Sequence, residues 1–247
     1  MAMTAKIEAP FDKTPRIVFF YRWLWRFWKE RRFQRFVDAI HPSPSCRLLD
    51  IGGYPSDWFS RGACIGRVDV LNLELAQLES LPPDAPEIQA LAGDARQLPF
   101  ANRHYDIVFS NSVIEHVGGI EDQQAFANEA RRIGIKLWIQ TPAKGCPIEP
   151  HYLGLFIHWF PKQWHVFLAR WTSIRGLTGA AKPAELVAIA HSTRLMTKKE
   201  VKALFPDCEI WTERLFWIFP KSYVAVRRES ETGLLMRGRR ECDVRPQ

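Results

Sequence analysis

Short apolar runs alternate with segments of helical periodicity from residue 47 onward. Gly52-Gly53 ends the first run and Thr141-Pro142 is expected to stop the fifth, as turn residues do at the ends of buried strands. Helices are predicted over residues 57–63, 123–133 and 197–205, the last with Thr197 as its cap and Glu200 three residues on. Strands are predicted over residues 47–51, 67–72, 87–92, 105–110, 135–140, 209–216 and 222–227.

The order of these elements predicts the fold class. Strands that alternate with helices return to the same edge of a sheet through right-handed crossovers, which produces a parallel sheet covered on both faces. The chain is therefore expected to be an α/β protein with a doubly wound, mostly parallel, seven-stranded sheet.

Three segments lie outside this alternation. Residues 1–44 form a predicted helical extension rich in basic and aromatic side chains, and residues 45–228 form the main domain. Residues 143–195 are a long insertion after the fifth strand, predicted to be helical and to recognise substrate, because connections of that length usually have a function. Residues 229–247 are a polar tail.

Composition and charge narrow the class of partner. The 247 residues are 47% hydrophobic and 25% charged, which is typical of globular proteins, whereas 13% aromatic residues is high. Six of the seven excess positive charges fall within residues 1–37, so a nucleic-acid-coating role is not expected.

Cysteine usage and hydropathy bear on metals and localisation. The five cysteines are scattered without a C-x-x-C pair, which argues against both a disulfide framework and a zinc site. Neither a secretory signal nor a spanning segment is visible, so a cytoplasmic location is expected.

Polar residues and glycines gather where the predicted strands end. Ligands of open α/β sheets bind beyond the carboxyl ends of the strands. Each cluster also has a purely structural explanation, since glycine allows a tight turn and Asp94 or a serine can cap a helix. The clusters are Asp50-Ile51-Gly52-Gly53, the segment 93–100 beginning Gly93-Asp94-Ala95, and the segment 110–117 containing Asn111 and His116.

Together these motifs resemble the class I S-adenosylmethionine-dependent methyltransferases of the group called methyltransferase type 11. The hallmark V-L-D-x-G appears as residues 48–52, G-D-A-x-x-L-P-F as residues 93–100, and F-D-x-V-x-S followed by E-H as residues 105–116. The resemblance covers residues 45–142 and implies a Rossmann-like fold that binds S-adenosyl-L-methionine.

The resemblance also implies roles for individual residues. Asp50 would anchor the first loop near the methionine amino group, and Gly52 and Gly53 would allow close backbone approach. Asp94 would accept a hydrogen bond from the adenine amine while the Ala95 amide reaches the ring. Asn111, or Ser110 beside it, would line the methionine side.

Two positions depart from the family pattern. The first loop lacks the further glycines and continues as Tyr54-Pro55, so that it is stiffer and Tyr54 is placed to cover the ligand. Asn72 stands where an acid would hold the ribose hydroxyls, with Glu74 two residues on. A non-catalytic scaffold that kept the fold therefore remains an alternative.

Transfer to an alcohol benefits from a base that titrates near neutral pH, which points to histidine. His116 is the predicted catalytic residue, although a packing or capping histidine explains it as well. Glu149 and His151 on the insertion are predicted substrate contacts, with a structural turn around Pro147 and Pro150 as the alternative.

The class of methyl acceptor is predicted from less specific sequence features. The insertion resembles a methyltransferase subset associated with polysaccharide and glycolipid pathways, which implies a hydroxyl of a sugar, glycolipid or other small molecule as the acceptor. Quinones, polyketides and protein side chains are alternatives. Residues 16–36 are a candidate for peripheral contact with the inner membrane face and hence for a lipid-linked acceptor, or a helix packed over the sheet.

Overall fold

The computed structural model describes residues 16–58, 65–75, 87–149, 154–173, 192–215 and 217–229. Side chains are described for most of these residues, but not for residues 16–27, Glu149, Lys162 and Val166. The predicted membrane-facing aromatic side chains of residues 16–27, His151 and most of residues 229–247 thus lie outside the described part of the structure.

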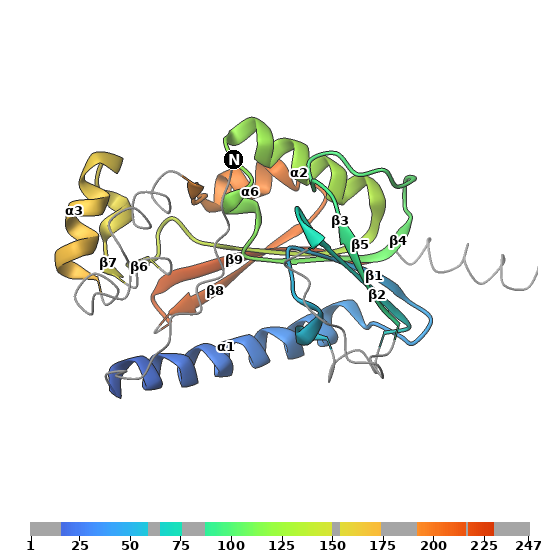
Figure 1. Cartoon of the computed structure of the whole chain (residues 1–247), viewed down its shortest axis with the longest axis horizontal. Helices are drawn as coiled ribbons and strands as arrows, with labels where there is room; N and C mark the ends of the chain where they lie inside the picture. Colours follow the sequence, from blue (N-terminus) through green and yellow to red (C-terminus); the bar gives the residue numbers. More distant parts are fainter. Residues whose placement is uncertain are drawn as a thin grey trace, which may run out of the picture.

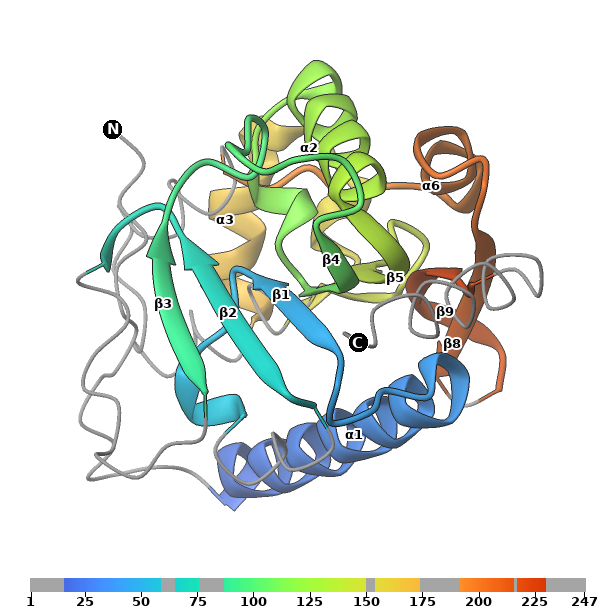
Figure 2. The ribbon, with the colours of Figure 1, turned by 90° about the vertical axis from the view of Figure 1, so that its right-hand side faces the viewer.

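A seven-stranded sheet forms the centre of the molecule, with the strand order β3-β2-β1-β4-β5-β9-β8 (Figures 1 and 2). β1 to β5 are parallel, and β9 pairs antiparallel with both β5 and β8. The expected doubly wound, mostly parallel, seven-stranded sheet is confirmed. The strands are β1 (Arg47–Ile51), β2 (Arg67–Asn72), β3 (Ile88–Ala92), β4 (Tyr105–Asn111), β5 (Gly134–Pro142), β8 (Glu209–Leu215) and β9 (Phe219–Arg227).

Helices cover the two faces of the sheet. α1 (Arg16–Ile40) lies along one face, and α2 (Ile120–Ile133) and α6 (Lys198–Leu204) lie on the other (Figure 2). α6 begins as expected, because Thr197 and Glu200 form a reciprocal capping box. α2 begins three residues before its predicted start, where the Asp122 carboxylate accepts a hydrogen bond from the Gly119 amide.

Two predicted strand boundaries are wrong, because β5 and β9 are both longer than the sequence predicted. Thr141-Pro142 does not stop β5, because Thr141 pairs with Tyr223 and Pro142 with Ser222 on β9. β9 likewise begins at Phe219 rather than at residue 222, since its turn with β8 is tight. Of the predicted helix 57–63, the described part holds only the short 3-10 helix η1 (Pro55–Asp57).

Each face of the sheet has its own apolar core. On the α1 side Phe36 and Ile40 are fully buried, and Phe36 meets Trp138 edge to face at 5.8 Å between ring centroids. Burying such a side chain contributes about 1.5–3 kcal/mol, so the second half of α1 belongs to the domain. On the other face, α2 contributes the buried side chains of Phe126 and Ile133 to the core, and Phe205 at the end of α6 adds a third.

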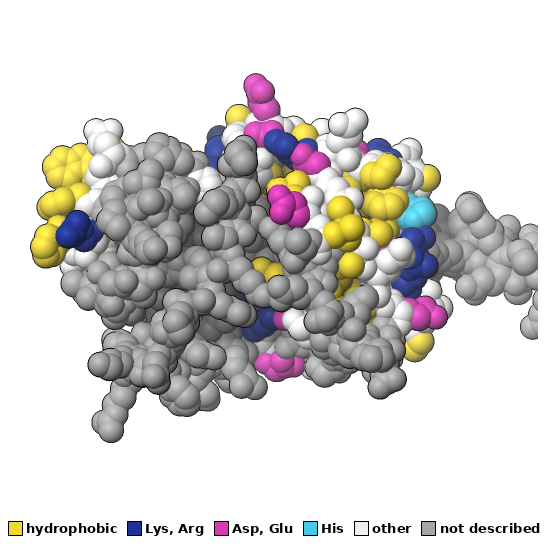
Figure 3. Space-filling view, viewed as in Figure 1, with side chains coloured by type: hydrophobic (Ala, Val, Ile, Leu, Met, Phe, Trp, Pro, Cys, Tyr) yellow, Lys and Arg dark blue, Asp and Glu magenta, His cyan; other side chains and the backbone are white. Residues whose placement is uncertain are grey.

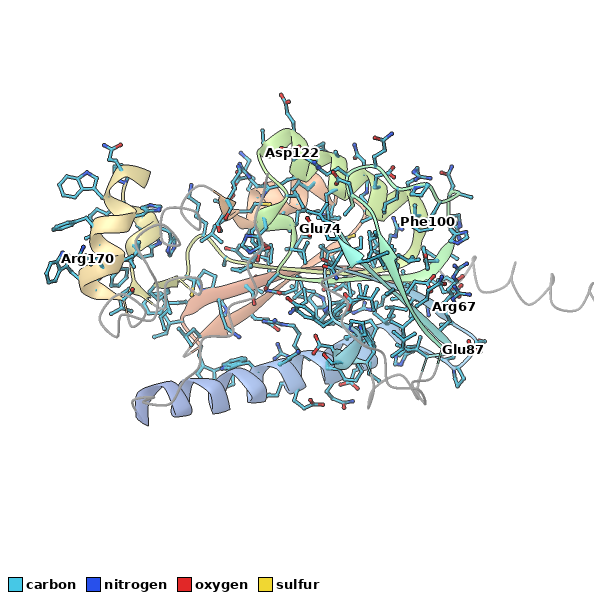
Figure 4. All side chains as sticks on the ribbon, in the orientation of Figure 1. Arg67, Glu74, Glu87, Phe100, Asp122 and Arg170 are labelled. Atoms are coloured by element: carbon cyan, nitrogen blue, oxygen red, sulfur yellow. The ribbon has the colours of Figure 1, made fainter. Side chains whose placement is uncertain are left out.

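The insertion after β5 is partly described. It contains a small hairpin of β6 (Ile148–Glu149) and β7 (Gly154–Leu155), the 3-10 helix η5 (Ile157–Trp159) and the helix α3 (Lys162–Thr172). These elements stand at the end of the molecule to which β5 leads, at the left in Figure 1. Arg67 and Glu87 lie where β2 and β3 begin, away from the insertion, and Glu74 lies toward the carboxyl ends of the strands (Figure 4).

Candidate functional site

The loops that follow β1, β2, β3 and β4 meet at one edge of the sheet. Parallel pairing aligns Asp50 with Val70 and Phe109, and Asn72 with Ala92, so the ends of these strands are level. The structure therefore brings together the residues that the sequence predicted as one site. These residues are Asp50, Gly52, Gly53, Asn72, Asp94, Ala95 and Asn111.

The loop after β1 is held tightly on both sides. Gly52 adopts a left-handed φ of 78°, and its amide donates to the Leu71 carbonyl at 2.7 Å. A Cβ on Gly52 would lie 2.4 Å from a Val113 methyl group, and a Cβ on Gly53 would lie 1.8 Å from the Asp50 carboxylate. The left-handed φ of Gly52 and the crowding at both Cβ positions therefore favour glycine at residues 52 and 53.

Asp50 is a buried carboxylate with one unused oxygen. Its Oδ2 accepts a hydrogen bond of 2.7 Å from the Trp58 indole, whereas no described residue hydrogen-bonds Oδ1. Burial raises the pKa of Asp50 to about 7, with the Trp58 hydrogen bond opposing the rise. An unpartnered buried acceptor beside a glycine loop fits a cationic ligand group, because a positive charge nearby would restore the ionised form.

Asn72 has a role that its position alone did not reveal. Its side-chain amide donates to the Gly53 carbonyl at 2.8 Å and so ties the end of β2 to the first loop. Leu73 and Leu75, which follow it, are both 58% exposed, and Glu74 between them is exposed as well. Two exposed leucines next to a polar loop provide an apolar surface for a flat ring, a feature that the sequence motifs did not flag.

Asp94 is engaged by a neighbouring arginine. The Arg96 guanidinium donates to both Asp94 carboxylate oxygens, to Oδ1 at 3.0 Å and to Oδ2 at 2.6 Å, and also to Asp122 on α2 at 2.6 Å. The Arg96 hydrogen bonds hold the pKa of Asp94 below its ordinary value. Both side chains are about 40% exposed, so this ion pair can exchange partners at little cost. Ala95 beside them is buried.

Asn111 connects the site to the amino-terminal helix. Its amide oxygen accepts a hydrogen bond of 2.8 Å from Arg32 of α1, and Arg32 also pairs with Glu213 of β8 at 2.5 Å. Burial raises the pKa of Glu213, but the charge and hydrogen bonds of Arg32 outweigh burial and bring it down to about 2. Sequence reasoning missed Arg32 and Glu213 because 181 residues separate them.

His116 ends the 3-10 helix η4 (Ile114–His116), directly after the β4 loop. Its Nε2 lies 4.0 Å from an oxygen of the fully buried Glu115, which is beyond hydrogen-bonding distance, and the ring is 35% exposed. Glu115 is fixed in turn by the Thr141 hydroxyl at 3.1 Å. The histidine therefore faces solvent at the same edge of the sheet as the predicted site.

The insertion supplies an open groove beyond the end of β5. It has a volume of about 640 Å³ and is lined by Lys144, Gly145, His158, Trp159, Phe160, Pro161, Thr197 and Tyr223. The Lys144 carbonyl accepts hydrogen bonds from the Trp159 indole at 3.1 Å and from the His158 ring at 2.8 Å. Glu149 lies in β6, close in the chain to this groove, and His151 is outside the described residues.

Neither a metal centre nor a membrane-spanning helix is found among the described residues. No group of three or more histidine, cysteine or acidic side chains there could hold a metal ion. No helix of that part of the chain is both long enough and apolar enough to cross a bilayer.

In the order of the sheet, β9 is the antiparallel strand and lies second from the β8 edge. This order and the glycine loop after β1 are typical of α/β proteins that bind nucleotide cofactors. Residues 49–136 match the family model described as "Methyltransferase domain". This segment spans the loops after β1 to β4 and therefore contains all seven predicted cofactor residues.

The similarity to solved structures extends beyond the matched segment. The PH0226 protein from Pyrococcus horikoshii OT3 is 13% identical, with 83% of this chain and 91% of that chain covered at a TM-score of 0.52. N-methyltransferase NodS from Bradyrhizobium japonicum WM9 is 12% identical over 83% and 98% of the two chains, at a TM-score of 0.49. A SAM-dependent methyltransferase from Anabaena variabilis is 16% identical over 75% and 77%, at 0.46. No curated protein matches in sequence.

Residues 49–136 therefore belong to the class I S-adenosylmethionine-dependent methyltransferases, and the chain has the fold of these enzymes. S-adenosylmethionine is the cofactor of this domain. The buried, unpartnered Asp50 oxygen and the two crowded glycines suit a cofactor that carries an ammonium group and a sulfonium charge.

Proposed function

We propose that this protein transfers the methyl group of S-adenosylmethionine to a hydroxyl of a sugar, a glycolipid or another small molecule. The observation that carries the proposal is the aromatic-walled groove beyond the end of β5, on the edge of the sheet where the glycine loop lies. When bound, the cofactor supplies an electrophilic methyl group that an oxygen attacks in line.

Three residues of the first loop would hold the methionine part of the cofactor. Asp50 would face its ammonium group with the oxygen that Trp58 leaves unused. Gly52 and Gly53 have no side chain and would allow the loop backbone to approach the cofactor closely. Asn111, oriented by Arg32, would line the same side.

The adenosine part would lie over the ends of β2 and β3. Asp94 would accept a hydrogen bond from the adenine amine once Arg96 has shifted, and Asp122 remains as a second partner for that arginine. Ala95 would offer its amide to the ring. Asn72 would meet the ribose through its amide oxygen, because its NH₂ group already donates to Gly53.

The groove beyond β5 suits an acceptor with flat apolar faces and many hydroxyls. Trp159 and Phe160 are each about half exposed and form an aromatic wall, and Lys144 and Tyr223 add polar groups. Sugars present C–H faces to aromatic rings and hydroxyls to polar side chains, so such a mixture fits them. Glu149 and His151, which follow in the insertion, remain proposed acceptor contacts.

His116 would accept the acceptor's hydroxyl proton. Its side chain is 35% exposed, and Glu115 at 4.0 Å, fixed by Thr141, would stabilise the imidazolium after proton transfer. Glu115 itself is fully buried and so acts on the acceptor only through the histidine.

The experiment is a turnover assay with purified protein, S-adenosylmethionine and a panel of sugars, glycolipids, quinones and small phenols, in which S-adenosylhomocysteine release is measured. His116→Ala should lower kcat by about 100-fold or more while S-adenosylhomocysteine affinity is unchanged. Trp159→Ala should raise KM for the acceptor, whereas Ile120→Ala, at a 48% exposed position on α2 outside the groove, should not.

Other outcomes would change the proposed acceptor or the proposed activity. Turnover only with a quinone or a protein would replace the hydroxyl acceptor by that class. Tight cofactor binding without turnover on any member of the panel would favour a non-catalytic scaffold with this fold.

A further inference from the structure

Helix α3 presents an aromatic face to the surroundings. Trp164, Phe167 and Trp171 are spaced three and four residues apart, so they lie on one side of the helix. They are 52%, 59% and 60% exposed, and the Trp164 and Phe167 rings meet edge to face at 6.4 Å. His165 and Ala169, in contrast, are buried.

This arrangement is inverted relative to an ordinary surface helix. Such a helix turns its apolar stripe inward and its polar residues outward. The outward surface of α3 continues into Leu155, Phe156, Trp159 and Phe160, which are 40–57% exposed. Figure 3 shows hydrophobic side chains gathered over α3 at the end of the molecule. A contiguous exposed apolar surface of this kind marks a site of interaction.

The Lys and Arg residues of the segment that carries this face have no acidic counterpart in that segment. The segment from residue 154 to residue 173 contains Lys162 and Arg170 but neither aspartate nor glutamate. The Arg170 guanidinium lies 5.8 Å from the centre of the Trp171 ring, so positive charge stands within the aromatic surface itself. The whole chain carries a net charge of +7.

We propose that the outward face of α3, defined by Trp164, Phe167, Arg170 and Trp171, docks on the surface of an anionic lipid bilayer. Tryptophan is favoured at the boundary between headgroups and acyl chains because its ring is apolar while its N–H can still hydrogen-bond. Arginine beside it is attracted by anionic headgroups. The segment that carries this face supplies positive charges and no carboxylate, so its charge is complementary to that of anionic headgroups.

A second element supports the same orientation. The turn between β8 and β9 lies beyond the end of β5, because Pro142, the last residue of β5, pairs with Ser222, three residues after β9 begins. Trp217 and Ile218 in that turn are 93% and 67% exposed. This edge of the sheet thus presents aromatic and aliphatic side chains at two places, both near the groove beyond β5.

The test is co-sedimentation of the full-length protein with vesicles of phosphatidylcholine, with and without about one third phosphatidylglycerol, at ~0.1 M salt. We expect binding to the anionic vesicles that is several-fold stronger than binding to the neutral ones. The triple variant Trp164→Ser, Phe167→Ser, Trp171→Ser should bind at least about 10-fold more weakly. Ile120→Ser, at a 48% exposed position on α2, is the matched control and should bind like the wild type.

Each remaining outcome overturns the proposal. Failure of the wild type to sediment with anionic vesicles, or equal sedimentation of the triple variant, excludes docking through this face. A dimer that the triple variant dissociates, without vesicle binding, would make the face an interface between copies. Circular dichroism and S-adenosylhomocysteine affinity of the variant show that it is folded, and they keep this test separate from that of the acceptor.

Discussion

Arg32 of helix α1 and Glu213 of strand β8 form a buried ion pair, with 2.5 Å between Nη2 and Oε2, that joins the amino-terminal helix to the far edge of the sheet. The same arginine donates to Asn111 at the carboxyl end of β4. Ser222 of β9 supplies a further hydroxyl to the pair. The helix is thereby fixed against the strand that leads into the candidate cofactor site.

Arg32→Ala should destabilise the protein by about 3 kcal/mol, because the buried Glu213 carboxylate loses its nearest cation and keeps only the Ser222 hydroxyl and the more distant Arg35, at 4.0 Å. Denaturation in urea measures the loss. Lys29→Ala is the matched control on the same helix. Its pair with Asp57 is 30–40% exposed, so its loss should cost no more than about 1 kcal/mol.

The pair also predicts a pH dependence. The folded pKa of Glu213 is lowered to about 2 from 4.5, so its stabilising contribution is complete above pH 4.5 and is lost as the pH falls through about 2. The double variant Arg32→Met, Glu213→Leu should recover most of the stability lost in Arg32→Ala and lack this acid dependence. A double variant as unstable as the single one would show that the pair is not the cause.

Asp50 predicts a pH dependence of the opposite sign. Its folded pKa is raised from 3.8 to about 7 by burial, so the folded state favours the protonated form. The free energy of unfolding should therefore fall as the pH rises from about 4 to 7, by up to about 4 kcal/mol. Asp50→Asn should remove that slope, and thermal unfolding across this pH range would show it.

Cofactor binding should change with the same titration. A ligand ammonium group favours the ionised carboxylate, so S-adenosylhomocysteine should bind more tightly as the pH rises through 7 and release a proton near neutrality. Calorimetry in buffers of different ionisation enthalpy measures that proton directly. An affinity that is independent of pH in the wild type would remove Asp50 from the ammonium contact.

The sheet was predictable from the sequence, whereas its connections to the site were not. The strands around Leu49, Val70 and Val108 are buried apolar runs bounded by turn residues, and such local patterns determine both their type and their order. The continuation of β5 through Pro142 depends on pairing with β9, about eighty residues later, which no local pattern records. For the same reason the contacts of Asn72 with Gly53 and of Asn111 with Arg32 appear only in three dimensions.

The crowding around the first loop gives a steric prediction. Gly53→Ala places a methyl group 1.8 Å from the Asp50 carboxylate, so the loop must shift and its hydrogen bond from Asn72 must weaken. We expect S-adenosylhomocysteine affinity to fall at least about 10-fold, equivalent to ~1.4 kcal/mol. Gly119→Ala is the control, because the nearest atom to its added methyl group is 3.9 Å away. Equal affinities of the two variants would exclude close approach at Gly53.

Asp94 offers the sharpest test of the adenine site, because its present partner is known. Asp94→Ala should weaken S-adenosylhomocysteine binding by ~1–3 kcal/mol if the carboxylate accepts from the adenine amine. Asp122→Ala removes the second, exposed carboxylate that Arg96 contacts while leaving Asp94 in place, so it should weaken the binding less than Asp94→Ala does. Calorimetric titration of both variants measures the difference. An equal loss in the two would mean that the Arg96 cluster acts by holding the loop after β3 to α2, and that Asp94 does not contact the adenine.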